Sequence, residues 1–271
     1  MSIPHRLIGK RALVTGASRG IGRAAAIRFA EEGASVAINH FRDGAAAEKT
    51  LEALHGASQR EGHGDAVHGA FDADMGEADE IAALFAAVLP HLGGLDILVN
   101  NAGFQEPTPG QAFDDAILER IVAVDLIGPA QCSRAAIAHF LSRTGGGVII
   151  NTTSVHELVP KPGYLAYSIA KGGLGNLTRT LALEFADKGI RVNAVGPGAI
   201  ATDMNAAWKD DARARAGVES HIPMGYAADA SDIAPVFAFL ACEDSRYITG
   251  QTIFACGGIT LYGEFKVNWA S

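Results

Sequence analysis

The fold of this chain is decided by the stretch TGASRGIG, residues 15–22, near the start of its 271 residues. It follows the apolar run ALV, residues 12–14, and precedes residues 23–32, where apolar side chains recur at helical spacing. Its glycines permit a tight turn, close approach of the backbone to a phosphate, and close packing of a helix on a strand. The helix N-terminus then offers free N–H groups and the positive end of its dipole to an anion. A strand, a glycine-rich turn and a helix in this order predict a dinucleotide-binding site.

Strand-like and helix-like segments alternate along the rest of the chain. Several strand-like segments are continuous apolar runs, as expected for a parallel sheet covered on both faces. We therefore predict one doubly wound, Rossmann-type α/β domain over residues 1–271, with a mostly parallel sheet of seven strands. Strands are expected near residues 11–15, 35–39, 66–71, 97–100, 148–152, 191–195 and 252–254. Helices are expected at residues 77–89, 113–141, 164–187 and 229–240, the second of them kinked at Gly128-Pro129.

Composition narrows the range of partners. The chain is 48% apolar and 19% charged, which suits one α/β domain with a large buried core. Its net charge of −8 argues against nucleic acid or an anionic membrane as partner, because both require basic surface. Cys132, Cys242 and Cys256 lack metal-ligand spacing, so they are interpreted as small buried hydrophobes and no metal site is expected. Residues 1–6 lead directly into the first strand without a signal peptide, so we expect a cytoplasmic protein.

Three side chains specify chemistry rather than fold: Ser154, Tyr167 and Lys171. A Tyr followed four residues later by a Lys places both side chains on one face of a helix. A free phenol titrates near ~10, and an ammonium within roughly 4–6 Å lowers that pKa because it favours the phenolate. Ser154 follows the apolar strand at residues 148–150, where its hydroxyl can hold a substrate oxygen beside the Tyr. The three groups predict proton transfer for an alcohol/carbonyl pair, with Tyr167 as the acid/base.

With these motifs in place, the sequence resembles the short-chain dehydrogenase/reductase family over nearly its whole length. The glycine spacing is Gly-x-x-x-Gly-x-Gly, and further matches are NNAG at residues 100–103, RVNAVGPG at 191–198, and TG at 249–250 leading to GG at 257–258. Within the family, the segments SVHE at 154–157, VESHIPMGY at 218–226 and GGITLY at 257–262 are similar to the bacterial glucose 1-dehydrogenases. The resemblance implies a small-molecule oxidoreductase that forms a homotetramer, paired partly through its long helices.

The resemblance also assigns residues to a dinucleotide cofactor. Asp74, followed by Met75, looks like the family's Asp-hydrophobe pair that meets the adenine amine, and Asp72 is the alternative. Asn101 and Gly103 would line the adenosine ribose, and Thr202 would meet the nicotinamide carboxamide. The predicted cofactor residues are Gly16, Ser18, Arg19, Gly20, Ile21, Gly22, His40, Arg42, Asp74, Asn101, Ala102, Gly103, Tyr167, Lys171, Pro197, Gly198, Ile200 and Thr202.

Cofactor choice is argued from the end of the second strand. Enzymes that select NAD usually place an acid there to hold the ribose 2′-hydroxyl, whereas this strand ends NHFR, residues 39–42. Asp43 is nearby but lies beyond Arg42. Arg19 and Arg42 are therefore predicted to clamp a 2′-phosphate with bidentate, charge-assisted bonds, so that NADP(H) is preferred and NAD(H) remains possible. The alternative is that both arginines are ordinary solvated charges.

Position 125 departs from the family pattern. The family usually has an Asn in the helix that carries VAVDLIG, residues 122–128, and Asp125 stands there instead. In the family that Asn helps to order a water linking the catalytic Lys to solvent. An ionised Asp cannot donate a hydrogen bond, and near Lys171 it would stabilise the ammonium while weakening the positive field on Tyr167. Asp125 is therefore predicted to tune the proton relay, and the alternative is that it braces the kinked helix.

Substrate contacts are predicted for Ser154, His156 and Tyr167, beneath a loop-and-helix segment at residues 199–226 that covers the substrate in the family. Polar residues cluster near the predicted site, and they suit a polyol or sugar better than a steroid. This polar set comprises His156, Glu157, Gln105 and Glu106.

These observations predict an NADP(H)-preferring oxidoreductase that acts on a sugar or similar polyhydroxy compound. One alternative with the same fold is a 3-oxoacyl or general ketone reductase. Another is a dinucleotide-binding regulatory protein without turnover, which is motivated only by Asp125.

Overall fold

Parallel strands form one sheet at the centre of the computed structural model, which describes residues 5–261. The strands are β1 (Arg11–Val14), β2 (Ser35–His40), β3 (His68–Asp72), β4 (Ile97–Asn100), β5 (Gly147–Thr152), β6 (Ile190–Pro197) and β7 (Thr252–Ala255). Their order is β3-β2-β1-β4-β5-β6-β7, and every pairing within it is parallel. This order confirms the doubly wound fold and places the switch point between β1 and β4, where ligands bind in such sheets.

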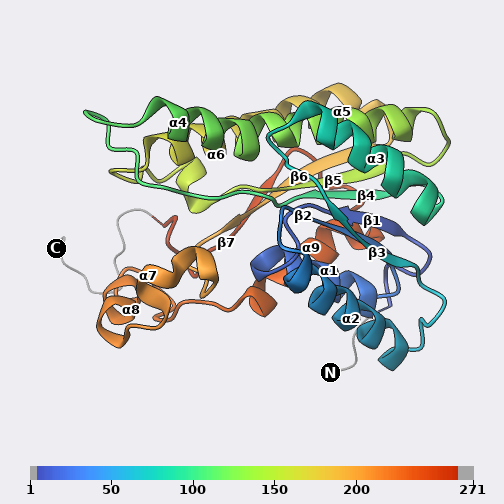
Figure 1. Cartoon of the computed structure of the whole chain (residues 1–271), viewed down its shortest axis with the longest axis horizontal. Helices are drawn as coiled ribbons and strands as arrows, with labels where there is room; N and C mark the ends of the chain where they lie inside the picture. Colours follow the sequence, from blue (N-terminus) through green and yellow to red (C-terminus); the bar gives the residue numbers. More distant parts are fainter. Residues whose placement is uncertain (1–4, 262–271) are drawn as a thin grey trace.

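Helices cover both faces of the sheet. The longer ones are α1 (Gly20–Glu31), α2 (Gly44–Arg60), α3 (Ala78–Leu92), α4 (Asp115–Val122), α5 (Gly128–Leu141), α6 (Leu165–Phe185) and α9 (Ala230–Ala241). In Figure 1, α1, α2 and α9 lie below the sheet, and α3 to α6 lie above it. Short 3₁₀ helices are η2 (Val155–Glu157), η3 (Ala186–Lys188), η4 (Asp203–Asn205) and η5 (Glu243–Ser245).

Each face of the sheet has its own apolar core. Phe29 of α1 and Phe237 of α9 belong to one core, and Phe140 of α5 belongs to the other. Successive residues of β1 divide between them, because Val14 joins the first core and Leu13 the second, as the alternation of side chains along a strand requires. Burial on both faces explains why the strands appear in the sequence as continuous apolar runs.

The helix expected at residues 113–141 runs from Asp115 to Leu141 and changes its helix type midway. Between α4 and α5 lies a π-helical turn, η1, over Ala123–Ile127. Gly128 and Pro129 begin α5 directly after this turn, so the change of helix type lies next to the position where the kink was predicted. A second difference is α2, for which the sequence analysis gave no helix.

The run from Asp115 to Leu141 is, within residues 5–261, the helical stretch long and apolar enough to cross a membrane by length and composition. Half of its most apolar window is buried inside the protein. Buried core helices meet the same criterion, so this stretch is weak evidence for a membrane span.

Residues 199–226 lie beside the two helical layers and carry η4, α7 (Ala206–Lys209) and α8 (Ala212–Glu219) (Figure 1). Neither α7 nor α8 contains a buried residue. The segment is attached to the body at its base, where Ile200 and Ala228 form a parallel bridge. Ile200 and Ile222 of the segment are buried, whereas its short helices α7 and α8 are not.

Candidate active site

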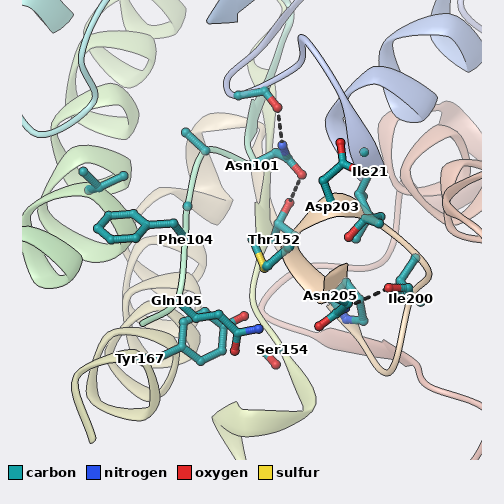
Figure 2. Close-up of a pocket in the computed structure, with 18 of the residues that line it drawn as sticks. Ile21, Asn101, Phe104, Gln105, Thr152, Ser154, Tyr167, Ile200, Asp203 and Asn205 are labelled. Carbon is teal, nitrogen blue, oxygen red and sulfur yellow. Dashed lines mark hydrogen bonds between the residues drawn. The ribbon is translucent and has the colours of Figure 1, made fainter. Parts of the chain in front are cut away.

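A cavity of about 690 Å³ opens along the carboxyl ends of the strands, and it unites most of the predicted site residues. Its walls come from the glycine-rich turn, the ends of β2, β4, β5 and β6, the start of α6, and residues 199–205. Figure 2 shows Ile21 and Asn101 in the upper part of the view and Gln105, Ser154 and Tyr167 in the lower part. We call the first part the cofactor end and the second part the substrate end. Gly22, Arg42 and Asp125 are predicted site residues that do not line this cavity.

The glycine-rich turn approaches the loop after β4 very closely. Gly16 has φ +60°, and a Cβ there would stand 2.6 Å from Cα of Ala102. Asn101 ties the two segments together, since its Nδ2 donates to the carbonyl oxygens of Thr15 and Gly16, each at 3.0 Å. The α1 helix begins at Gly20 rather than after the turn, so its first N–H groups face the cavity. Gly22 packs against Asn101 and Gly16, where a Cβ would stand 2.4 Å from Asn101 Nδ2.

The two arginines predicted to form a clamp lie in different surroundings. Arg19 lines the cavity, and its Nη1 is 3.9 Å from the Asp43 carboxylate, which also accepts a bond from Ser18 Oγ at 2.9 Å. Arg42 has φ +51°, and its guanidinium carbon lies 4.8 Å from the centre of the Phe41 ring. Arg19 therefore lines the cavity and Arg42 does not, and Asp43, which follows Arg42, lines it as well.

Of the two candidate adenine ligands, Asp74 lines the cavity and Asp72 does not. Asp72 accepts a bond from the backbone N–H of Arg42 at 3.0 Å. Both carboxylate oxygens of Asp74 accept from Nη2 of Arg120, at 2.8 and 2.7 Å. Arg120 was missed by the sequence analysis, because its partner lies 46 residues away and no local spacing connects them.

Ser154, Tyr167 and Lys171 converge at the substrate end and are each less than 8% exposed. Tyr167 and Lys171 share one face of α6, with the Lys171 Nζ 5.4 Å from the centre of the Tyr167 ring. Lys171 Nζ donates to the carbonyl oxygen of Thr152 at the end of β5, at 3.1 Å. Ser154 begins η2, and its Oγ accepts from the backbone N–H of His156 at 3.1 Å.

Asp125 is fully buried directly behind Lys171. Its Oδ2 lies 3.1 Å from Lys171 Nζ, and its Oδ1 accepts from the backbone N–H of Phe104 at 3.0 Å. Gly103 makes room for this carboxylate, since a Cβ at Gly103 would stand 2.6 Å from Oδ2. Asp125 lies within the π-helical turn, a feature that often occurs at functional sites. The structure therefore places Asp125 in contact with Lys171, and whether it tunes the proton relay or braces the helix stays a prediction.

The charges around Tyr167 act in opposite directions. Burial raises the pKa of Tyr167, the Lys171 ammonium lowers it, and the Asp125 carboxylate raises it, with a net rise above the ordinary value. Burial lowers the pKa of Lys171, but the Asp125 carboxylate and Tyr167 outweigh burial and hold the ammonium charged. Burial raises the pKa of Asp125, and Lys171 and the Phe104 N–H offset part of that rise. Lys171 and Asp125 thus act on the pKa of Tyr167 with opposite signs.

The segment after β6 supplies the wall between the two ends of the cavity. Pro197, Gly198, Ile200 and Thr202 all line it, as predicted. Ile200 is buried, and its carbonyl oxygen accepts from Nδ2 of Asn205 at 2.8 Å, which closes a tight loop (Figure 2). The Thr202 methyl lies over Gly20, 3.7 Å from where a Cβ would be.

The substrate end differs in part from expectation. His156 lines the cavity, and its ring centre lies 6.2 Å from that of Tyr167. Glu157 is directed elsewhere: its carboxylate is 2% exposed and bonds Arg179 at 3.0 Å and Thr252 at 3.1 Å, so it braces η2 against α6 and β7. Lys161 also lines the substrate end and was missed.

A dinucleotide-type fold with a buried Ser, Tyr and Lys at its strand ends defines an oxidoreductase class acting on CH–OH groups. A family model described as enoyl-(acyl carrier protein) reductase matches residues 16–260. The chain belongs to the short-chain dehydrogenase/reductase family, whose members bind NAD(P).

Several known proteins are similar over nearly their full length. Glucose 1-dehydrogenase of Gluconobacter oxydans is 46% identical, over 98% of this chain and 97% of that protein. 3beta-hydroxysteroid dehydrogenase 1 of Eggerthella lenta is 44% identical, over 96% of this chain and 97% of that protein. A solved structure of a candidate 2-deoxy-D-gluconate 3-dehydrogenase from Agrobacterium tumefaciens, with bound NADP, is 29% identical at a TM-score of 0.85, over 95% of this chain and 99% of that one.

Proposed function

We propose that this protein transfers a hydride between a nicotinamide cofactor, with NADP(H) preferred, and an alcohol/carbonyl pair in a sugar or other polyhydroxy compound. The observation that carries the proposal is the convergence of Ser154, Tyr167 and Lys171 at one end of a cavity whose other end is formed by the glycine-rich turn. Similarity to a glucose 1-dehydrogenase supports the substrate class.

The cavity residues fit a dinucleotide. No side chain at Gly16 blocks the approach to the turn, so a pyrophosphate can meet the first N–H groups of α1. Asp74 would face the adenine, Asn101 and Gly103 the adenosine ribose, and Thr202 the nicotinamide. When bound, the nicotinamide supplies the acceptor or donor of the hydride.

Each of the three buried groups has a distinct task. Tyr167 moves the proton of the reacting hydroxyl, and Ser154 holds the reacting oxygen in place. Lys171 holds the ribose hydroxyls and its charge favours the phenolate. Because burial and Asp125 raise the pKa of Tyr167, the positive charge of an oxidised nicotinamide would complete the field that makes this residue a base.

The preference for NADP(H) rests on Arg19, whose side chain can meet a 2′-phosphate from within the cavity. Asp43 opposes the preference, because its carboxylate lies 3.9 Å from Arg19 Nη1 and would repel a phosphate. Arg42 contributes only if its guanidinium leaves the Phe41 ring. The bound NADP in a similar solved structure supports the phosphorylated form of the cofactor.

A second candidate function is a reductase of 3-oxoacyl or other ketones. The description of the family model and the similarity to a steroid dehydrogenase favour it. The regulatory alternative without turnover has little support, since Asp125 pairs with Lys171 and leaves Ser154 and Tyr167 in place.

We further propose a cytoplasmic homotetramer without a nucleic-acid or membrane partner. Large apolar side chains are exposed on α6, where Ile169 is 48% and Leu183 87% exposed, and contact with a second copy of the chain would cover them. Sedimentation at micromolar concentration is expected to give a tetramer, and a monomer would contradict the proposal.

The decisive experiment follows NADP+ and NAD+ reduction with a panel of aldoses, polyols and hydroxyacyl esters. Turnover of polyhydroxy compounds with NADP+ supports the proposed function. Turnover of acyl or apolar substrates alone supports the ketone reductase. Cofactor binding without turnover of any member supports the regulatory alternative.

A further inference from the structure

Lys161 stands on the wall of the substrate end, in the loop between η2 and α6. That loop is attached to the body through Thr108, which is fully buried. The backbone N–H of Thr108 donates to Gly163 O at 2.7 Å, and Thr108 Oγ1 accepts from the N–H of Ala166 at 3.0 Å. These bonds restrain the backbone of the loop beside the cavity, and Gln105 and the Tyr164 ring contact the Lys161 ammonium itself.

The surroundings of Lys161 are polar or aromatic but carry no negative charge. Its Nζ donates to Oε1 of Gln105 at 2.7 Å and lies 3.6 Å from the centre of the Tyr164 ring. Within residues 5–261, no carboxylate forms an ion pair with it. Burial lowers the pKa of Lys161, and no acidic neighbour raises it again. A half-buried cation without a counter-ion is costly, and an anionic ligand would remove that cost.

The carboxylates that line the cavity have cations of their own. Asp43 is close to Arg19, Asp74 is bonded by Arg120, and Asp203 is bonded by Lys209. Asp125 lies behind the wall and pairs with Lys171. At the substrate end, therefore, Lys161 is the cation that no described carboxylate neutralises.

The charge of Lys161 reaches the site of chemistry. Burial lowers the pKa of His156, and the Lys161 charge lowers it further, so the two side chains are electrostatic neighbours. The His156 ring is in turn 6.2 Å from the Tyr167 ring. Lys161, His156 and Tyr167 all line the same cavity, so one small molecule bound there can contact both Lys161 and the proton-transfer group.

We propose that Lys161, aided by Gln105, binds the carboxylate of the substrate, so that the protein acts on a polyhydroxy acid rather than on a neutral sugar. A single ammonium matches the single charge of a carboxylate, whereas a phosphate dianion would call for further donors. This inference rests on the proposed function and specifies its substrate class.

The reaction balances for such a substrate. In oxidation, the C–H bond of one carbinol carbon breaks and its hydride passes to oxidised NAD(P), while the hydroxyl proton passes to the Tyr167 phenolate. The carbinol becomes a ketone, NAD(P)+ becomes NAD(P)H, and one proton is released to solvent. The carboxylate held by Lys161 is unchanged.

The test compares an acid with neutral analogues: D-gluconate against D-glucose and D-glucitol, with NADP+ and NAD+. Wild type is expected to show a kcat/KM for gluconate at least tenfold above that for glucitol. Lys161→Gln should raise the KM for gluconate by roughly 10–100-fold, as expected for a lost charge-assisted bond, and change the KM of neutral substrates less than about threefold. Lys161→Arg should restore most of the loss.

Lys188→Gln is the matched control, because Lys188 is exposed, pairs with Asp187 and lies outside the cavity. Turnover of glucose or glucitol without gluconate would overturn the inference and leave the proposed function standing. Turnover of none of the three would count against the proposed function itself. Calorimetric binding of gluconate to the enzyme–NADP+ complex then decides the inference: binding that Lys161→Gln abolishes supports it, and no binding or unchanged binding overturns it. Glucose 6-phosphate used in preference to gluconate would also overturn it.

Discussion

Two ion pairs beside the same cavity differ in almost every physical respect. Lys171 and Asp125 are 3.1 Å apart with side chains 5% and 0% exposed, whereas Arg19 and Asp43 are 3.9 Å apart with side chains 68% and 31% exposed. A charge acts over a longer range where water is excluded, and exposed pairs are weak and screened by salt. The buried pair is therefore suited to shift the pKa of a neighbour, and the exposed pair to exchange its partner for a ligand.

The largest effect is expected from deletion of the Tyr167 hydroxyl, whose pKa the buried pair influences. Tyr167→Phe keeps the ring and its packing but deletes the phenol, so turnover should fall by at least the ~10²–10⁴-fold typical of lost general acid–base catalysis. Cofactor affinity and the fold should be unchanged. Steady-state rates measure turnover, and fluorescence titration with NADPH measures cofactor affinity.

Tyr247→Phe is the control, because Tyr247 is fully exposed outside the cavity. A Tyr167→Phe variant that keeps more than a tenth of wild-type turnover would show that Tyr167 is not the acid/base.

The exposed pair should affect binding and not chemistry. Arg19→Ala should weaken NADP(H) binding by about 10–150-fold more than NAD(H) binding, since a charge-assisted contact contributes roughly 1.5–3 kcal/mol. The difference should shrink at high ionic strength. Arg42→Ala should have a smaller effect, because its guanidinium packs on Phe41. Equal losses for both cofactors after Arg19→Ala would refute the contact with a 2′-phosphate.

Asp125→Asn tests the buried pair directly. Removal of the carboxylate leaves the Lys171 charge unopposed near Tyr167, so the pKa of Tyr167 should fall. The alkaline-activating limb of oxidation should then move to lower pH. The measurement is the oxidation rate against pH at saturating cofactor, for wild type and variant.

The other groups that face this pair are the Phe104 N–H, the Thr152 carbonyl and Tyr167, and of these only Tyr167 titrates. Cofactor affinity should change little. Superimposable pH limbs, with only thermal stability altered, would assign Asp125 a bracing role.

His68 is also buried but, unlike Lys171, has no carboxylate beside it within the described residues 5–261. Burial lowers its pKa from 6.5 to about 4, so the unfolded chain takes up the proton first as the pH falls. The stability that a neutral His68 contributes is complete above about pH 6.5 and is lost as the pH falls toward about 4. His68→Gln should flatten this dependence in denaturant unfolding between those pH values, and an unchanged slope would exclude His68 as its source.

Most of the fold was predictable from short-range patterns. Each strand of the sheet overlaps a segment where a strand was expected, and several of these segments are continuous apolar runs, as is typical of a parallel strand buried on both faces. The helix α2 was missed although its buried residues Ala47, Thr50, Leu54 and Ala57 recur at helical spacing, because most of them are small or polar. The π-helical turn was beyond reach, since nothing local distinguishes Ala123–Ile127 from an α-helix.

In the candidate site, too, some residues could be predicted from sequence spacing and others could not. Ser154, Tyr167 and Lys171 have fixed spacings, and the strand ends bring them together. Arg120 and Lys161 depend instead on partners that only the tertiary fold brings near, 46 residues away at Asp74 and 56 residues away at Gln105. Their side chains were therefore invisible to spacing arguments. The roles of Tyr167, Arg19 and Asp125 stay predictions, which the variants described above test.

The π-helical turn between α4 and α5 limits where residues can be inserted into or deleted from this chain. A π turn holds one more residue than an α turn, so it shifts the angular phase of everything after it by about 100°. The helix α4 packs on α6, and α5 packs on α3, and the phase shift lets one continuous rod serve both neighbours. Deletion of one residue within Ala123–Ile127 would restore α-helical phase. Either Asp125 would turn away from Lys171, or the apolar face of α5 would turn away from α3. The turn is thus a point where the residue count of the chain is constrained by packing on both sides.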